Sequence, residues 1–325
     1  MLLWLGIPIA TQAQYGYLIN GNGTVSITSY SGSGGAVNIP STINGRAVTH
    51  IWDEAFKYSG LTSVTIPGSV VYVGNRAFAY CPNLVSVTIP GSVTSAGEYV
   101  FSGCRKLSNV TIGYGVNEIW YGMFSSCSSL TSLTIPNSVT NISIFAFSYC
   151  YNLMDVAIPN SVTSISPEAF YRCTSLATIT IPGSVTHLDY GVFSECSALW
   201  GVYFCGNAPT SVGENLFLEA YNVTVYYLAG TLGWKATFAG RPTCPYVIEG
   251  VSSFSLDQTI RCVGAGWSRT MVMDLTYFYV SKTQDGYGSY SVEYSLFYDD
   301  WMGIYIYDYD TGAFSAVTWQ IKLDL

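Results

Sequence analysis

Six cysteines recur along the chain at a constant interval of 23 residues, at Cys81, Cys104, Cys127, Cys150, Cys173 and Cys196. Thiols can act as nucleophiles, bind soft metals or pair as disulfides. A zinc site is not indicated, because no two cysteines have C-x-x-C spacing and the chain has only two histidines. Equivalent positions of stacked strands lie about 4.8 Å apart, beyond the roughly 3.5–4.5 Å between the Cβ atoms of a disulfide. The pattern therefore predicts a structural column of free, buried thiols.

Three further cysteines, Cys205, Cys244 and Cys262, fall outside this column. In an exported protein these cysteines could form disulfides, because disulfides persist in oxidising compartments. The sequence leaves two alternatives open, namely free thiols and a Cys244–Cys262 bridge to the C-terminal part of the chain.

Other candidates for catalysis or metal binding are few. Nothing in the sequence gives His50 or His187 the acid and the nucleophile that a catalytic triad needs. No P-loop, dinucleotide-binding fingerprint or H-E-x-x-H motif is present. Acidic residues gather at 299–300 and 308–310, but D-x-D-x-G is shorter than a calcium loop and also suits a hairpin turn. We therefore predict a non-enzymatic protein without a cofactor or a bound metal.

The composition of the 325 residues excludes several classes of protein. Twelve Lys and Arg against twenty Asp and Glu give a net charge of −8, whereas a nucleic-acid-binding protein needs a basic surface. The chain is 49% hydrophobic and only 10% charged, which excludes a disordered protein. No apolar stretch reaches the roughly 18 residues of a membrane-spanning helix. The 32 glycines and 27 tyrosines favour strands and turns over helices.

The elements that must position these residues are repeats of 23 residues. Leucines recur at the same 23-residue interval as the cysteines, and the pair Ile-Pro recurs with one break, at Ile112-Gly113. Phenylalanines mark eight turns of the repeat, at Phe56, Phe78, Phe101, Phe124, Phe147, Phe170, Phe193 and Phe217. Within one repeat, Val87 and Ile89 alternate with Ser86 and Thr88, which predicts a strand with one buried face. A unit this short cannot bury its own apolar side, so the units must stack into a solenoid.

Three segments of the repeat suggest a family: LTSLTIP at 130–136, SVTNI at 138–142 and AFSYC at 146–150, each with copies in neighbouring repeats. They resemble the BspA-type leucine-rich repeat of bacterial surface proteins, and the resemblance covers about residues 36–217. It implies a mostly β, right-handed leucine-rich-repeat solenoid. It also implies protein binding or adhesion at a bacterial surface.

The chain divides into five parts on this basis, of which residues 46–217 are the repeats. Residues 14–45 are expected to form a β-hairpin cap and a degenerate first coil, because two short strands flank an Asn/Gly turn at 20–23. Residues 218–247 resemble the closing unit of some family members. Residues 248–325 predict a small antiparallel β domain, with strands at 271–280, 289–298, 302–307 and 313–323.

Residues 1–13, MLLWLGIPIATQA, resemble the apolar part and cleavage site of a signal peptide that lacks its basic start. A signal peptide predicts a secreted or cell-surface protein of a bacterium. The alternative is an N-terminal strand that is buried in the fold.

Candidate binding residues lie in columns that vary between repeats. One column contains Arg76, Tyr99, Gly122, Phe145, Glu168 and Gly191, and another contains Tyr80, Gly103, Ser126, Tyr149, Arg172 and Glu195. Exposed Tyr and Trp offer contact area at a low entropic cost, so we predict binding residues at Tyr80, Tyr99, Trp120, Tyr121, Tyr149, Tyr151, Tyr171 and Tyr190. The expected partner is an extracellular or cell-surface protein. Two alternatives remain: exposed tyrosines of the repeats or of the C-terminal β domain, such as Tyr277, Tyr290, Tyr294 and Tyr305, could stack on a glycan, or the variation could reflect relaxed constraint at surface loops.

Overall fold

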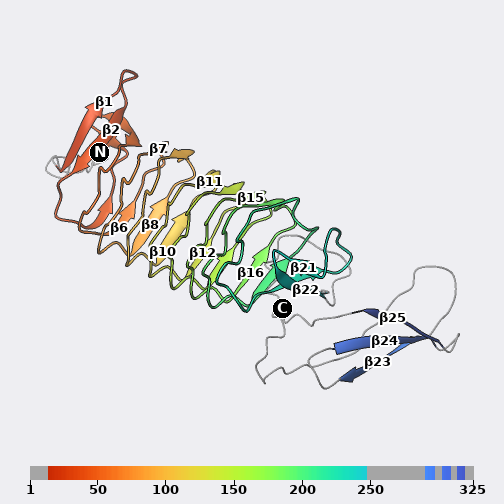
Figure 1. Ribbon diagram of the computed structural model, residues 1–325. Coiled ribbons are helices and arrows are strands. Elements are labelled where there is room, and N and C mark those ends of the chain that lie inside the picture. The colour runs from red at the N-terminus through yellow and green to blue at the C-terminus, as the bar shows by residue number, and fades with distance from the viewer. Residues whose placement is uncertain (1–13, 247–289, 297–301, 309–312, 319–325) are drawn as a thin grey trace.

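The computed structural model describes residues 14–246 with their side chains, and the strands at residues 290–296, 302–308 and 313–318. All the regular secondary structure in these ranges is β-strand. Residues 14–246 wind coil upon coil into an elongated solenoid (Figure 1), which confirms the fold that the 23-residue period predicts. None of the described residues belongs to a helix that could cross a membrane.

Each coil contains a short strand, a turn and a longer strand, and the coils are numbered 1–8 by their phenylalanines. The short strands pair in parallel in two groups. The first group contains β2 (Val25–Tyr30), β5 (Arg46–Ile51), β7 (Tyr72–Val73) and β9 (Ser95–Ala96). The second contains β11 (Glu118–Ile119), β13 (Asn141–Ile142), β15 (Ser164–Ile165), β17 (His187–Leu188) and β19 (Ser211–Val212).

The longer strands pair in parallel on another side of the coils, in three groups. The first contains β3 (Gly35–Asn38), β6 (Leu61–Thr65), β8 (Ser86–Ile89) and β10 (Asn109–Ile112). The second contains β12 (Ser132–Thr134) and β14 (Asp155–Ala157), and the third contains β16 (Thr178–Ile181), β18 (Gly201–Phe204), β20 (Thr224–Leu228) and β22 (Arg241–Tyr246). Their register is direct, with Val87 opposite Val110 and Thr88 opposite Thr111.

The two ends of the solenoid are atypical. At the N-terminal end, β1 (Tyr15–Ile19) forms an antiparallel hairpin with β2, and β4 (Thr42–Ile43) pairs with β5. At the other end, β21 (Thr237–Phe238) pairs antiparallel with β22. Capping of this kind is required because a terminal coil would otherwise expose its core.

The C-terminal strands β23 (Tyr290–Leu296), β24 (Met302–Asp308) and β25 (Ala313–Thr318) pair antiparallel, in agreement with the predicted character of this segment. Several expectations lie outside the described residues. These are the signal peptide at 1–13, the strand at 271–280, Cys262 and the acidic pair at 299–300.

The core of the solenoid is a ladder of phenylalanine rings. Successive rings from Phe56 to Phe217 are stacked, with centroids 4.8–5.9 Å apart and interplanar angles of 10–17°. Each ring is almost completely buried. Because every ring contacts the coils on both sides, the ladder ties the array together along its whole length.

The cysteine column runs beside the phenylalanine ladder. All six side chains are buried and free, and each thiol donates to the carbonyl of the phenylalanine in the preceding coil, as Cys150 does to Phe124 at 3.1 Å. Burial raises the pKa of the Cys150 and Cys196 thiols to about 12. The column is therefore a structural feature of the core. Outside it, Cys205 and Cys244 are also free thiols.

Candidate functional site

The turn between the short and the longer strand contains two residues with left-handed backbone in every coil. The first column comprises Glu54, Arg76, Tyr99, Gly122, Phe145, Glu168, Gly191 and Asn215, and the second comprises Tyr58, Tyr80, Gly103, Ser126, Tyr149, Arg172, Glu195 and Glu219. Their φ angles lie between 51° and 73°. These are the two columns in which the sequence varies from repeat to repeat, extended to coils 1 and 8.

In coils 1–7 the residues with left-handed backbone donate their N–H groups to the next coil, as does the phenylalanine that lies between them. The N–H of Tyr99 donates to the carbonyl of Tyr121 at 2.8 Å, and the N–H of Gly103 donates to that of Ser125 at 2.8 Å. Glycine adopts this conformation without strain, whereas other residues lose roughly 1–2 kcal/mol. Of these sixteen positions only three are glycine, so most coils tolerate the strain and keep a side chain on this surface.

Aromatic and cationic side chains line the turns of coils 1–5, as the pair Tyr58 and Tyr80 and as a neighbouring row from Arg76 to Phe145. The Tyr58 and Tyr80 rings stack 5.4 Å apart at 19°. The Arg76 guanidinium lies 5.4 Å from the centroid of Tyr99, and Tyr99 meets Tyr121 edge-on at 5.2 Å. Phe145 continues the row with a T-shaped contact to Tyr121 at 5.7 Å.

The row continues in coils 5–7 around Arg172. Its guanidinium lies 5.6 Å from the centroid of Tyr149 and 5.3 Å from that of Tyr171, and its Nε donates to Glu195 at 2.6 Å. The Tyr171 hydroxyl donates to the same carboxylate at 2.6 Å, and Tyr149 meets Tyr151 edge-on at 6.1 Å. We call the whole row the aromatic edge, comprising Tyr58, Arg76, Tyr80, Tyr99, Tyr121, Phe145, Tyr149, Tyr151, Tyr171, Arg172, Tyr190 and Glu195.

Titration behaviour reflects this packing. The hydrogen bond from Arg172, followed by that from Tyr171, lowers the pKa of the Glu195 carboxyl below its ordinary value. The hydrogen bond that the Tyr171 hydroxyl donates to Glu195 raises the pKa of the Tyr171 phenol. Burial, followed by the hydrogen bond to Tyr121, raises the pKa of Tyr99 to about 12. At neutral pH the Tyr99 and Tyr171 phenols are therefore protonated and the Glu195 carboxylate is ionised.

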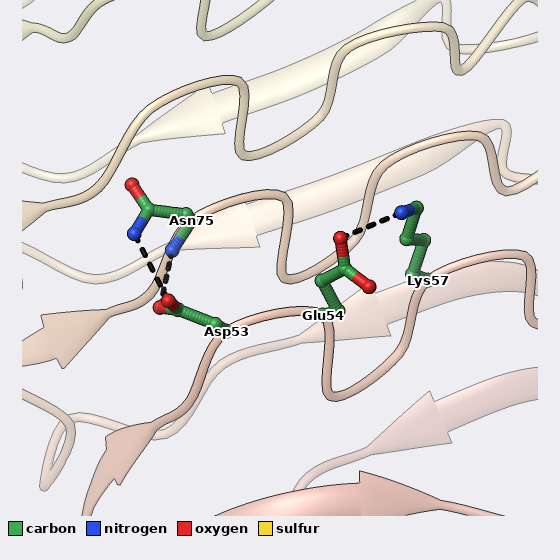
Figure 2. Close-up of polar contacts among 4 residues, drawn as sticks. All are labelled: Asp53, Glu54, Lys57 and Asn75. Atoms are coloured by element: carbon green, nitrogen blue, oxygen red, sulfur yellow. Dashed lines mark hydrogen bonds and ion pairs between the residues drawn. The ribbon is translucent and has the colours of Figure 1, made fainter.

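Polar side chains order the N-terminal end of the edge (Figure 2). The Asp53 carboxylate accepts hydrogen bonds from the backbone N–H of Asn75 at 2.8 Å and from its side-chain amide at 3.0 Å. The Asn75 side-chain oxygen in turn accepts from the backbone N–H of Glu98 at 2.8 Å. Within coil 1, Lys57 pairs with Glu54 at 2.6 Å and lies 5.2 Å from the ring centroid of Tyr58.

Seven of the eight predicted binding residues lie on this edge. Tyr80, Tyr151 and Tyr190 are exposed, and Tyr99, Tyr121, Tyr149 and Tyr171 are half-buried. The expected exposure of the remaining residue, Trp120, is corrected by the structure, because its side chain is only 7% exposed and belongs to the core. The position after the short strand does not by itself set this direction, because Trp52 directly after β5 is 48% exposed.

Sequence reasoning missed Tyr58, which is 66% exposed and begins the row. The distance from Tyr58 to Tyr80 is 22 residues, so a strict period of 23 places Tyr58 outside its column. Also missed were the contacts of Arg76 and Arg172 with the tyrosine rings. The signal was present, since both arginines stand in the variable columns beside aromatic residues.

Other surfaces of the coils offer less chemistry. The outer face of the longer strands carries exposed hydroxyls at Thr65, Thr88, Thr111 and Thr134. His50 and His187 each contact the hydroxyl of the preceding threonine, at 2.9 Å and 2.8 Å. Within residues 14–246, no three His, Cys, Asp or Glu side chains are grouped as metal ligands would be.

Comparisons with known proteins agree with this architecture. The sequence model described as BspA type leucine rich repeat region matches in six copies, over residues 49–166 and 118–232. A leucine rich cell surface protein from Faecalibacterium prausnitzii is similar in structure, with 27% identity, a TM-score of 0.52, and coverage of 66% of this chain and 69% of that one. A leucine rich repeat protein from T. pallidum is 30% identical, with a TM-score of 0.50 and coverage of 65% and 88%. A search of curated protein sequences found no match.

Proposed function

The chain belongs to the BspA-type leucine-rich-repeat family, and we propose that it is a non-enzymatic bacterial scaffold that binds an extracellular or cell-surface protein through its aromatic edge. Solenoids suit this role because their stacked coils present long, rigid surfaces. A location outside the cell is supported by the leader-like residues 1–13 and by the similar F. prausnitzii protein, which is described as a cell surface protein.

The observation that carries the proposal is the use of strained positions for large side chains. Glycine at Tyr99, Tyr149 or Arg172 would relieve the left-handed backbone, yet these positions hold two tyrosines and an arginine. Tyr, Trp and Arg are the residues that contribute most to protein interfaces. The rings are also held in place by their neighbours, so little side-chain entropy would be lost on binding.

The geometry of the rings favours a protein over a glycan. Stacking on a sugar needs an open ring face, but Tyr58 and Tyr80 stack on each other and Arg76 lies against Tyr99. Tyr149 has Arg172 against its ring and is contacted by Tyr151 and Tyr171. The edge therefore presents hydroxyls, ring edges and charged groups, which suit the mixed polar and apolar surface of a protein.

The test is a binding screen with the full chain against arrays of purified extracellular proteins and of glycans. Each hit is then measured with an edge variant, Tyr58→Ser/Tyr151→Ser/Tyr190→Ser, which alters three exposed tyrosines of the edge. The matched control is Thr65→Ala/Thr88→Ala/Thr134→Ala, which alters three exposed residues of the strand face. We expect a protein ligand whose affinity falls at least about tenfold in the edge variant, since interface tyrosines often contribute more than 1 kcal/mol each.

Three results would contradict the proposal. Binding that only the threonine variant loses would move the interface to the strand face. Binding of glycans alone would favour the carbohydrate alternative. Equal binding by both variants would remove the exposed tyrosines of the edge from the interface.

A further inference from the structure

The solenoid is interrupted at one junction, between coil 3 and coil 4. The short strands β9 and β11 lie in different sheets, and so do the longer strands β10 and β12. The longer strands are interrupted again between β14 and β16, but there the short strands β13 and β15 remain paired. Within residues 14–246, the junction of coils 3 and 4 is therefore the only one between coils 1 and 8 at which both sheets are broken.

The backbone hydrogen bonds between the short strands are also interrupted at the junction of coils 3 and 4. At the junction before it, Thr94 and Gly97 of coil 3 donate to Val71 and Val73 of coil 2. At the junction after it, Thr140 and Ser143 of coil 5 donate to Asn117 and Ile119 of coil 4. The equivalent amides of coil 4, those of Asn117 and Trp120, donate to no group of coil 3 within the described part of the chain.

Side-chain ladders also stop at this junction. The ladder Asp53–Asn75–Glu98 ties coils 1–3 together, and its position in coil 4 is occupied by Tyr121. A second ladder begins on the other side, where Asn141 donates to Glu118 at 2.7 Å and Ser164 donates to Asn141 at 2.8 Å.

The sequence at the junction departs from the repeat in two places. Most coils have Pro-x-Ser after the longer strand, and the serine donates to a valine carbonyl of the preceding coil, as Ser138 does to Val116 at 2.6 Å. Coil 3 instead continues with Gly113-Tyr114-Gly115, which has no hydroxyl to donate to coil 2, and the N–H of Gly115 donates to Ser138 at 3.0 Å. Trp120 also fills a position that is Gly97 in coil 3 and Ser143 in coil 5. Trp52, at the equivalent position of coil 1, is 48% exposed and donates its backbone N–H to Ile27 at 2.8 Å, whereas Trp120 is buried at this corner, beside the unpaired strands β9 and β11.

Most of what crosses the junction lies on the side of the turns. On the opposite side, Ser138 after β12 donates to Val116 at 2.6 Å and accepts from the N–H of Gly115 at 3.0 Å. Tyr99 and Phe101 donate their backbone N–H groups to Tyr121 and Met123, at 2.8 Å and 2.9 Å. The Phe101 and Phe124 rings stack at 5.9 Å, and the Cys127 thiol donates to Phe101 at 3.3 Å. The two halves are thus joined along the aromatic edge and unpaired along both sheets.

We infer that this junction is a hinge, with the aromatic edge as its axis. Coils 1–3 and coils 4–8 are two stiff blocks, because each is joined internally by pairing on more than one side. Bending at the junction opens or closes the gap between the strands and leaves the edge continuous. This inference rests on the hydrogen-bond pattern alone and holds whether or not the edge binds a protein.

The test measures distances between nitroxide pairs in the full chain by pulsed electron spin resonance. The labels are attached to a keto-bearing amino acid, so the native cysteines are untouched. One pair, at Thr94 and Thr140, spans the junction on the short-strand side, and a matched pair at Thr140 and Thr186 spans two coils within one block. All three threonines are exposed members of one column. A third pair, at Arg105 and Tyr151, spans the junction on the turn side, where both residues are exposed.

A hinge predicts a distance distribution about twofold broader for the pair at 94 and 140 than for the pair at 140 and 186, with a narrow distribution for the pair at 105 and 151. Equal widths for the two short-strand pairs would overturn the hinge. Equal broadening of the pair at 105 and 151 would overturn the assignment of the axis. A Trp120→Ser variant, which introduces the residue found at this position in coils 5 and 6, is expected to narrow the distribution at 94 and 140, and a further broadening would contradict a role of the buried indole in keeping the strands unpaired.

Discussion

The ring of Tyr99 lies against the backbone of Gly122 in the next coil, where a Cβ atom would overlap its Cδ1. Both residues belong to the same left-handed column, with φ angles of 57° and 58°. The same relationship joins Tyr80 and Gly103 in the second column. In these places a glycine both accepts the left-handed backbone and makes room for the tyrosine of the coil before it.

This relationship predicts the effect of Gly122→Ala. The new methyl group must displace the Tyr99 ring and also occupy a left-handed position, so we expect a loss of about 2–4 kcal/mol in the free energy of unfolding. Urea denaturation followed by circular dichroism measures the change. Gly68→Ala is the control, because nothing lies within 4 Å of a Cβ atom there and its φ is not positive. An equal effect of the two substitutions would show that Gly122 is not special.

The strain at non-glycine positions predicts a gain of stability from Ser126→Gly. Ser126 has φ 62° and a small side chain, so glycine relieves the backbone and removes little packing. We expect unfolding to become harder by about 0.5–1 kcal/mol, since the left-handed strain exceeds the entropy that glycine adds to the unfolded chain. Ser129→Gly, three residues later and without a positive φ, should instead destabilise by a similar amount. A loss of stability at both positions would contradict the assigned backbone conformation.

The sequence predicted the repeating parts of the fold and little of what breaks the repeat. The spacing of the Phe and Cys columns was sufficient for the strands and the core, because a buried column tolerates little change. The edge was found only as two columns that vary, since a left-handed φ does not specify one residue type, and only at Gly103 and Gly122 does a neighbouring tyrosine ring leave no room for a Cβ atom. The inward direction of Trp120 and the unpaired junction beside it depend on how two coils meet, and no single repeat contains that information.

The buried thiols predict that stability falls steeply in alkaline solution. Burial raises the pKa of Cys127, Cys150, Cys173 and Cys196, in two cases to about 12, whereas an unfolded thiol titrates near 8.5. A raised pKa in the folded state contributes stability that is complete below pH 8.5 and is lost as the pH rises toward 12. Four such thiols give a slope of up to about 5 kcal/mol per pH unit well above pH 8.5.

Thermal melts at pH 7 and pH 9.5 measure this slope, with the double variant Cys150→Ala/Cys173→Ala as the comparison. The variant should be less stable at pH 7, because it loses two packed side chains, but its melting temperature should change less between the two pH values. Alkylation mapped by mass spectrometry gives an independent readout, since the column should resist iodoacetamide until the chain is unfolded. The same pH response in both proteins would mean that the thiols are not protected in the folded state.

The phenylalanine ladder predicts that one charge in its centre divides the array. Phe124 is fully buried between Phe101 and Phe147, with centroids 5.9 Å and 5.8 Å away. Phe124→Asp places an unpaired carboxyl in this position, at a cost of more than about 4 kcal/mol. Stability in a solenoid is a sum of neighbouring interfaces, so the coils on the two sides should lose their cooperativity and melt in separate transitions. Phe124→Leu keeps an apolar side chain and should shift a single transition by a few degrees. If the melting curve of the Asp variant matched that of the parent, the register of the repeat would be wrong.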